Sequence, residues 1–203
     1  MHSFEDKTDT LVRLLGSPTS NVNARQGDCV FNFHYLPDEW AVMRRFIPKI
    51  KARLEKIGFT IHLHSFADII SEILDSEAKL PIQAMIANEE TFGLAHQDYT
   101  NDLQRILTGQ AENTPLTLDS PIVRKLIAVI DEAALIPKSV LLLTDVEMLH
   151  PLIRVSAFEQ ILQGRFKVPT VIFYPGRRGS VGDNPSFLGI YTSDGNYRST
   201  HVY

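Results

Sequence analysis

One stretch of the chain, residues 139–178, constrains the fold more than any other. It reads SVLLLTDVEMLHPLIRVSAFEQILQGRFKVPTVIFYPGRR. Its two short apolar runs, Val140–Leu143 and Val171–Tyr174, are typical of buried strands because they are rich in β-branched or aromatic residues. Apolar residues at helical spacing lie between them, which predicts a helix that begins near Pro151 and ends at Gly164. The stretch is therefore predicted to be a strand–helix–strand unit whose parallel strands are buried on both faces.

Polar and charged residues follow each of these two strands. In open α/β sheets, functional residues collect just beyond the carboxyl ends of the strands. Arg154 begins the intervening helix, close to the end of the first strand. An ion pair with the acidic residue after that strand and a role in binding a partner or an anion both stay open for it. The candidate binding residues are Asp145, Arg154, Pro175, Gly176, Arg177 and Arg178.

A second strand–helix–strand unit precedes this one. Cys29–His34 and Phe59–His64 are rich in strand formers, and they flank a helical segment that follows Pro37. Pro48 lies inside the segment, so we expect a kink or a local break there. The unit predicts a right-handed parallel crossover. The apolar stripe of the helix consists of Trp40, Met43, Phe46, Ile47, Ile50, Leu54 and Ile57.

Residues 65–135 are predicted to form a helical insertion between the second and third strands. Ser65 and Asp68 match a helix-capping pattern, and the apolar residues that follow have helical spacing. Residues 109–119 are polar and contain proline, which is typical of a linker. Ser120 is then expected to cap a last helix that starts at Pro121.

The two ends of the chain complete the predicted domain, which spans residues 1–203. Residues 3–15 resemble an amphipathic helix, which either docks on the domain or binds a partner as an arm. At the other end, residues 187–191 and 197–202 are predicted to form an antiparallel hairpin around Asp194-Gly195. The predicted fold is a three-layer, Rossmann-like α/β sandwich with a mostly parallel sheet.

Composition narrows the class of protein. The hydrophobic fraction of 44% and the charged fraction of 22% are ordinary for a globular chain. The formal net charge of -4 disfavours broad nucleic-acid binding. A single cysteine, Cys29, fits a reducing compartment, and no apolar run approaches the ~18 residues of a membrane span. We therefore expect a cytoplasmic protein that is not inserted in a membrane; its oligomeric state is left open.

No complete catalytic or metal-binding set emerges from the residues. Asp145 ends an apolar strand as in P-loop ATPases, yet the glycine-rich phosphate loop with its lysine is absent. The glycines after Pro175 are interpreted as a surface loop, with an anion site as the alternative. His62 and His64 share one face of a strand but lack further ligands, so structural histidines are expected. We predict a protein without enzymatic activity and without a cofactor.

Several short patterns in the chain resemble the BrxB family of bacterial BREX (bacteriophage exclusion) defence systems. The patterns at the two ends of the central unit are Leu143–Val146 with Pro151 and Arg154, and Val168–Gly176. Two departures are Asp145, where the family pattern has glycine, and the pair Arg177-Arg178. The resemblance extends to Phe33–Pro37, to Phe187–Gly189 and to Asn196–Arg198.

The resemblance implies a non-enzymatic accessory protein that contacts other BREX proteins, above all the phosphatase-like PglZ component. No catalytic residues accompany the family. A second hypothesis is a nucleotide- or anion-binding regulator that uses Asp145, Arg154, Arg177 and Arg178. Direct binding of nucleic acid is the third and least favoured, because the chain is acidic.

Overall fold

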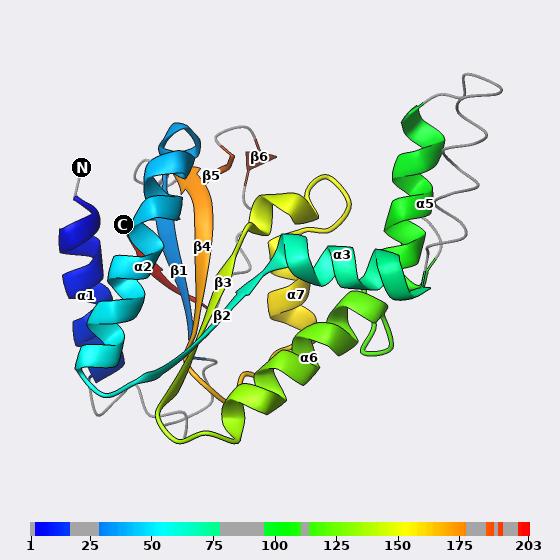
Figure 1. Ribbon diagram of the computed structural model, residues 1–203. Coiled ribbons are helices and arrows are strands. Elements are labelled where there is room, and N and C mark those ends of the chain that lie inside the picture. The colour runs from blue at the N-terminus through cyan, green and yellow to red at the C-terminus, as the bar shows by residue number, and fades with distance from the viewer. Residues whose placement is uncertain are drawn as a thin grey trace.

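A parallel sheet forms the centre of the computed structural model (Figure 1). The structure describes residues 3–16, 29–77, 96–110, 114–177, 186–188, 191–192 and 199–203. Five parallel strands lie in the order β2-β3-β4-β1-β7. They are β1 (Val30–Tyr35), β2 (Thr60–Ser65), β3 (Ser139–Thr144), β4 (Thr170–Arg177) and β7 (Thr200–Val202). Two short strands, β5 (Ser186–Phe187) and β6 (Tyr191–Thr192), extend it in antiparallel fashion from the end of β4.

Helices cover both faces of this sheet. On one face lie α1 (Phe4–Gly16) and α2 (Trp40–Lys56), and on the other lie α6 (Pro121–Ala134) and α7 (Val155–Ile161) (Figure 1). The helices α3 (Phe66–Glu77) and α5 (His96–Thr108) extend outward beyond β2 and pack with α6. Single 3-10 turns, η2 (Pro37–Glu39) and η3 (Val146–Leu149), follow β1 and β3. The predicted α/β class and the insertion between β2 and β3 are confirmed.

Strand β3 shows how the sequence produces two cores. Val140 and Leu142 pack under α1 and α2, whereas Leu141 and Leu143 pack under α3, α6 and α7. All four are buried, as the continuous apolar run predicted. Because a fully buried leucine or valine contributes roughly 1.5–3 kcal/mol, this strand anchors both layers.

The N-terminal helix docks on the domain, which confirms one of the two interpretations of residues 3–15. Leu11 and Leu15 are buried in the core under α2, and the Phe4 and Phe46 rings lie 5.4 Å apart between their centroids. Lys7 donates from Nζ to the main-chain oxygen of His34 at 2.7 Å. The helix is therefore held at the end of β1 by apolar and polar contacts together.

The central helix begins later than predicted. Pro151 lies in a turn after η3, and α7 starts at Val155 with Arg154 at its N-cap. The prediction was wrong because Leu152 continues the apolar spacing of the helix toward Pro151 although it lies in the preceding turn. Gly164, with φ of 74°, lies just past the helix end as predicted.

Helix α2 continues through Pro48 without a break. Proline has no N–H to donate, so the main-chain carbonyl of Arg44, four residues earlier, lacks its hydrogen bond within the helix. Both Arg44 and Pro48 are exposed. Ser120 occupies the N-cap of α6, but its hydroxyl accepts the N–H of Thr117 instead of capping the helix.

The predicted C-terminal hairpin is present in part and is placed differently. Phe187 pairs with Tyr191 in the antiparallel strands β5 and β6, so the hairpin lies earlier in the chain than predicted. Residues 200–202 instead pair parallel with β1, where Val202 is buried under α1. Asp194-Gly195 lies outside the described residues. The Rossmann-like description is not confirmed, since the strand order is not that of the dinucleotide-binding folds.

Candidate functional site

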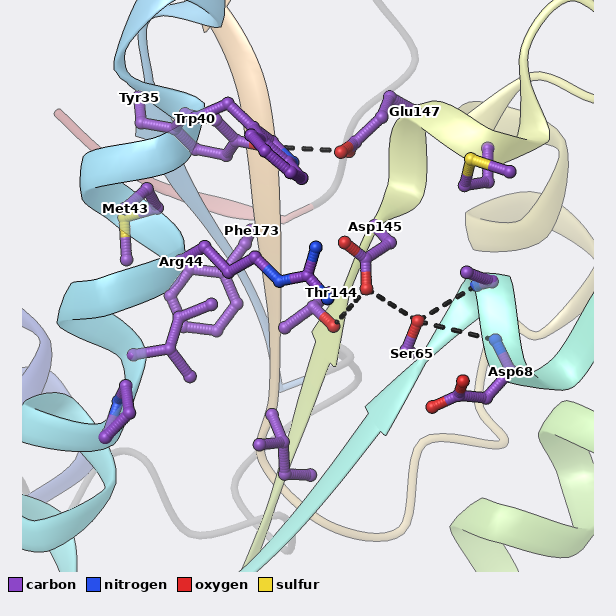
Figure 2. Close-up of a pocket in the computed structure, with 15 residues that line it drawn as sticks. Tyr35, Trp40, Met43, Arg44, Ser65, Asp68, Thr144, Asp145, Glu147 and Phe173 are labelled. Atoms are coloured by element: carbon purple, nitrogen blue, oxygen red, sulfur yellow. Dashed lines mark hydrogen bonds between the residues drawn. The ribbon is translucent and has the colours of Figure 1, made fainter.

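A groove of about 460 Å³ opens at the carboxyl ends of β1, β2 and β3, beside α2 (Figure 2). Helix α2 forms one wall, the start of α3 and the turn η3 form the other, and Phe173 of β4 lies at the base. This is the edge at which α/β sheets bind ligands. The lining residues are Tyr35, Trp40, Met43, Arg44, Ile47, Pro48, Leu63, Ser65, Ala67, Asp68, Thr144, Asp145, Glu147, Met148 and Phe173.

Asp145 organises the far wall of the groove. Its carboxylate oxygen Oδ2 accepts hydrogen bonds from Ser65 Oγ at 2.6 Å and from Thr144 Oγ1 at 2.9 Å (Figure 2). Its backbone is left-handed, with φ of 57° and ψ of 35°, a conformation that aspartate tolerates better than most residues. The positive φ explains why a glycine is expected at this position.

The hydroxyl of Ser65 makes several hydrogen bonds at the start of α3. It accepts the N–H of Ala67 at 3.0 Å and, more weakly, the N–H of Asp68 at 3.4 Å, while it donates to Asp145. This confirms the predicted cap of α3 and links the ends of β2 and β3. The hydroxyl therefore caps α3 and holds the end of β2 against the end of β3.

Glu147 lies in η3, on the same wall of the groove as Asp145, and its side chain points toward Tyr35 and Trp40 (Figure 2). Tyr35 donates from its hydroxyl to Glu147 Oε2 at 3.5 Å, and burial raises the pKa of both groups. The nearby Asp145 raises the pKa of Glu147 further, whereas hydrogen bonds from Trp40 and Tyr35 lower it. Glu147 thus fixes the orientation of the aromatic residues at the groove mouth.

Three large apolar side chains remain exposed around the groove. Trp40 is 41% exposed, Leu63 is 45% exposed and Met148 is 50% exposed. The guanidinium carbon of Arg44 lies 5.2 Å from the centroid of the Trp40 ring, a cation–π distance. Tryptophan, methionine and arginine are the residue types that concentrate in protein interfaces.

The charge of the groove is predominantly negative. Asp68, Asp145 and Glu147 line it, against a single cationic side chain, Arg44. Arg44 extends from α2 toward Thr144 and Asp145 (Figure 2). An unscreened phosphate would meet more repulsion than attraction here, whereas a basic group would be attracted.

The structure brings one of the six predicted binding residues into this groove, Asp145. Arg154 is exposed at the N-cap of α7 and lies near His150, whose pKa it helps to lower after the larger effect of burial. The Asp145 carboxylate accepts hydrogen bonds from Ser65 and Thr144, on the far wall of the groove.

The predicted glycine–arginine loop after β4 is wrong in its first half. Pro175 and Gly176 are buried and belong to β4, as does Arg177. Gly176 pairs with Phe187 in the antiparallel extension, which prolongs the strand past the apolar run. Arg178 lies outside the described residues.

Sequence reasoning missed most of the groove. Trp40 was assigned to the apolar stripe of α2. It is the first residue of that helix, and helical spacing alone cannot show that the sheet does not cover this first residue. Leu63 was assigned to a strand, and its exposure follows from the edge position of β2. The acidic and apolar residues after β3, Glu147 and Met148, carried the one usable signal, because they follow a strand end.

A buried polar cluster lies on the opposite face of the sheet from the groove. His34 Nε2 and His201 Nδ1 share a hydrogen bond of 2.7 Å, and the His34 ring stacks on Tyr203. Asn32 donates to Glu159 Oε1 at 3.1 Å and to Ser199 Oγ at 2.7 Å. Within the described part of the chain, no group of three or more His, Cys, Asp or Glu side chains could hold a metal ion. The cluster is a hydrogen-bonded support for β1 and β7.

Comparison with known families matches residues 63–202 to the model described as BREX protein BrxB. This range covers more than half of the 203 residues. The chain belongs to the BrxB family. The match includes residues 63–65 of β2 and also Asp145, Glu147 and Met148, but not α2, so the family model covers one wall of the groove. The comparisons with curated proteins and with solved structures gave no match.

Membership in the BrxB family makes this protein a component of a BREX defence system. Among the residues that the structure describes, no helix is both long enough and apolar enough to cross a membrane.

Proposed function

We propose that this BrxB protein works in the cytoplasm as a non-catalytic interaction module, and that the groove beside α2 binds another BREX protein. The PglZ-like component is the first partner to test. The observation that supports this proposal is the exposure of Trp40, Leu63 and Met148 around one groove. Large exposed apolar side chains gathered at one site mark a surface that a partner covers.

The mixture of residues in the groove favours a protein partner. Trp40 is a rigid apolar anchor and Met148 an adaptable one, and the Arg44 guanidinium lies over the Trp40 ring. Interfaces have such an apolar centre with a polar rim. The hydroxyls of Ser65 and Thr144 donate to Asp145, so these polar groups hold the groove wall together.

Binding to purified BREX proteins, tested one at a time by calorimetry, checks the proposal. The double variant Trp40→Ala, Met148→Ser should weaken the complex about tenfold or more, because truncation of an interface anchor costs ~2 kcal/mol or more. Leu135→Ser is the matched control: Leu135 is 82% exposed but precedes β3, at the amino ends of the strands, whereas the groove lies at their carboxyl ends.

Equal affinities of the wild type and the groove variant would overturn the docking site. A loss that appeared with Leu135→Ser instead would move the interface to the amino ends of the strands. If no BREX protein bound the wild type, the interaction role itself would be refuted.

A further inference from the structure

The outer edge of β2 runs alongside the groove. β2 ends the strand order, and no strand in the described part of the chain pairs with its far side. The strand is exposed or half-buried along all six residues, in contrast to the buried β1. Leu63 belongs to this edge and to the groove lining at once.

The hydrogen-bond register shows which main-chain groups face outward. The N–H of Thr60 bonds the carbonyl of Lys138 at 3.0 Å, so Thr60 directs its main chain toward β3. Successive residues of a strand direct these groups to opposite sides. His62 and His64 therefore also face β3, whereas Ile61 and Leu63 present their N–H and carbonyl groups at the free edge.

We propose that a partner segment binds as an added strand along the outer edge of β2, with its alternate side chains reaching over Leu63 into the groove. The inference rests on the proposed docking function and specifies how the partner is held. An exposed edge with unpaired main-chain groups is a template for strand addition, and side-chain pockets beside it supply specificity.

The chemistry of the groove defines the segment. Apolar side chains would cover Leu63 and Met148, and a lysine or arginine would lie against Asp68 and Asp145. A second copy of this chain fits less well, because pairing two β2 edges would bring two acidic grooves together. The occupant is therefore an extended segment of a BREX partner that alternates apolar residues and carries at least one basic residue.

Amide hydrogen exchange, resolved by residue, tests the inference on the full-length protein with and without the purified partner that binds it. In the free protein, the amides of His62 and His64 should exchange slowly and those of Ile61 and Leu63 quickly. In the complex, exchange at Ile61 and Leu63 should slow by about tenfold or more, since each amide gains a hydrogen bond. His62 and His64 serve as the internal control.

A pair of variants at one position gives a second readout. Leu63→Pro removes the outward N–H without touching the ladder to β3, and Leu63→Ala removes the side chain but keeps that N–H. Leu63→Pro should bind about fivefold to tenfold more weakly than Leu63→Ala, at comparable melting temperatures. If Leu63→Pro does not fold, the exchange experiment decides alone.

The outcomes separate the two proposals. Unchanged exchange at Ile61 and Leu63, in a complex that Trp40→Ala still weakens, would overturn strand addition and leave the docking groove standing. A change in solution mass on Leu63→Pro in the absence of partner would show that β2 pairs two copies of this chain, which would also overturn it. Absence of any complex would refute both proposals.

Discussion

Acid should destabilise this protein through one buried histidine, His34. Its side chain is 2% exposed in β1, and it contacts His201 of β7, Tyr174 of β4 and the C-terminal Tyr203. Burial lowers the pKa of His34 to about 3, with further lowering by the neighbouring His201 and by Lys7 of α1, against a smaller raising effect of the Gly176 backbone. Burial also lowers the pKa of His201.

The sign and size of the effect follow from proton linkage. Between pH 6.5 and pH 3, the unfolded chain binds a proton at His34 and the folded protein does not, so the free energy of unfolding falls as the pH falls. From pH 7 to pH 5, the loss is about 2 kcal/mol for His34 alone. For a chain of this size, that corresponds to a melting temperature lower by ~4–8 °C.

Urea unfolding of the wild type and of His34→Gln across pH 5 to 7.5 measures the effect. Carboxylates contribute the same pH dependence to both proteins, so the difference between their curves isolates His34 (the two should converge toward pH 5). His64→Gln is the control, because His64 is only half-buried on β2. Parallel curves for His34→Gln and the wild type would refute the reasoning.

Three further predictions concern the groove and its support. Asp145→Ala should unfold more easily than Asp145→Gly by about 1 kcal/mol in urea titrations, since both lose the carboxylate but only alanine is strained at the positive φ; equal stabilities would argue against the left-handed backbone. Leu11→Ala should cost ~2–5 kcal/mol of unfolding free energy, because Leu11 is fully buried, whereas the exposed Arg13→Ala should change little; a silent Leu11→Ala would mean that α1 is not docked. Asp68→Asn should weaken partner binding in low salt and approach the wild type in high salt, because an exposed charge acts through a screened field; a salt-independent loss would point to a structural role of Asp68.

The parts of the fold that the sequence predicted well are those in which local pattern and burial agree. Val140–Leu143 and Val171–Tyr174 are apolar without interruption, and both became central strands with helices on each face. The cap at Ser65 was also predictable, because a hydroxyl three residues ahead of an acidic residue satisfies main-chain donors locally. These features depend on neighbours in the chain and need no knowledge of distant partners.

Strand order and the free edge were not predictable, because they depend on distant pairings. Residues 200–202 have the composition of a hairpin strand, but the side of β1 away from β4 offers a parallel partner, and Val202 reaches the core from there. Because β7 occupies the edge of the sheet beside β1, the strand order leaves β2 at the other edge, beside β3. The exposure of Leu63 and the outward amides follow from that position, and no local pattern in residues 60–65 announces it.

One predicted residue of the candidate site, Asp145, does lie in the groove. The role that the sequence suggested for Asp145 differs from the one that the structure gives it. In sequence it looked like the acidic end of a nucleotide-binding strand. In the structure its carboxylate joins Ser65 at the end of β2 to Thr144 at the end of β3. One side chain therefore fixes the far wall of the groove relative to the β2 edge and adds negative charge to the wall. A partner strand on that edge would be held in register with the groove, so the two proposed surfaces would act as one docking site.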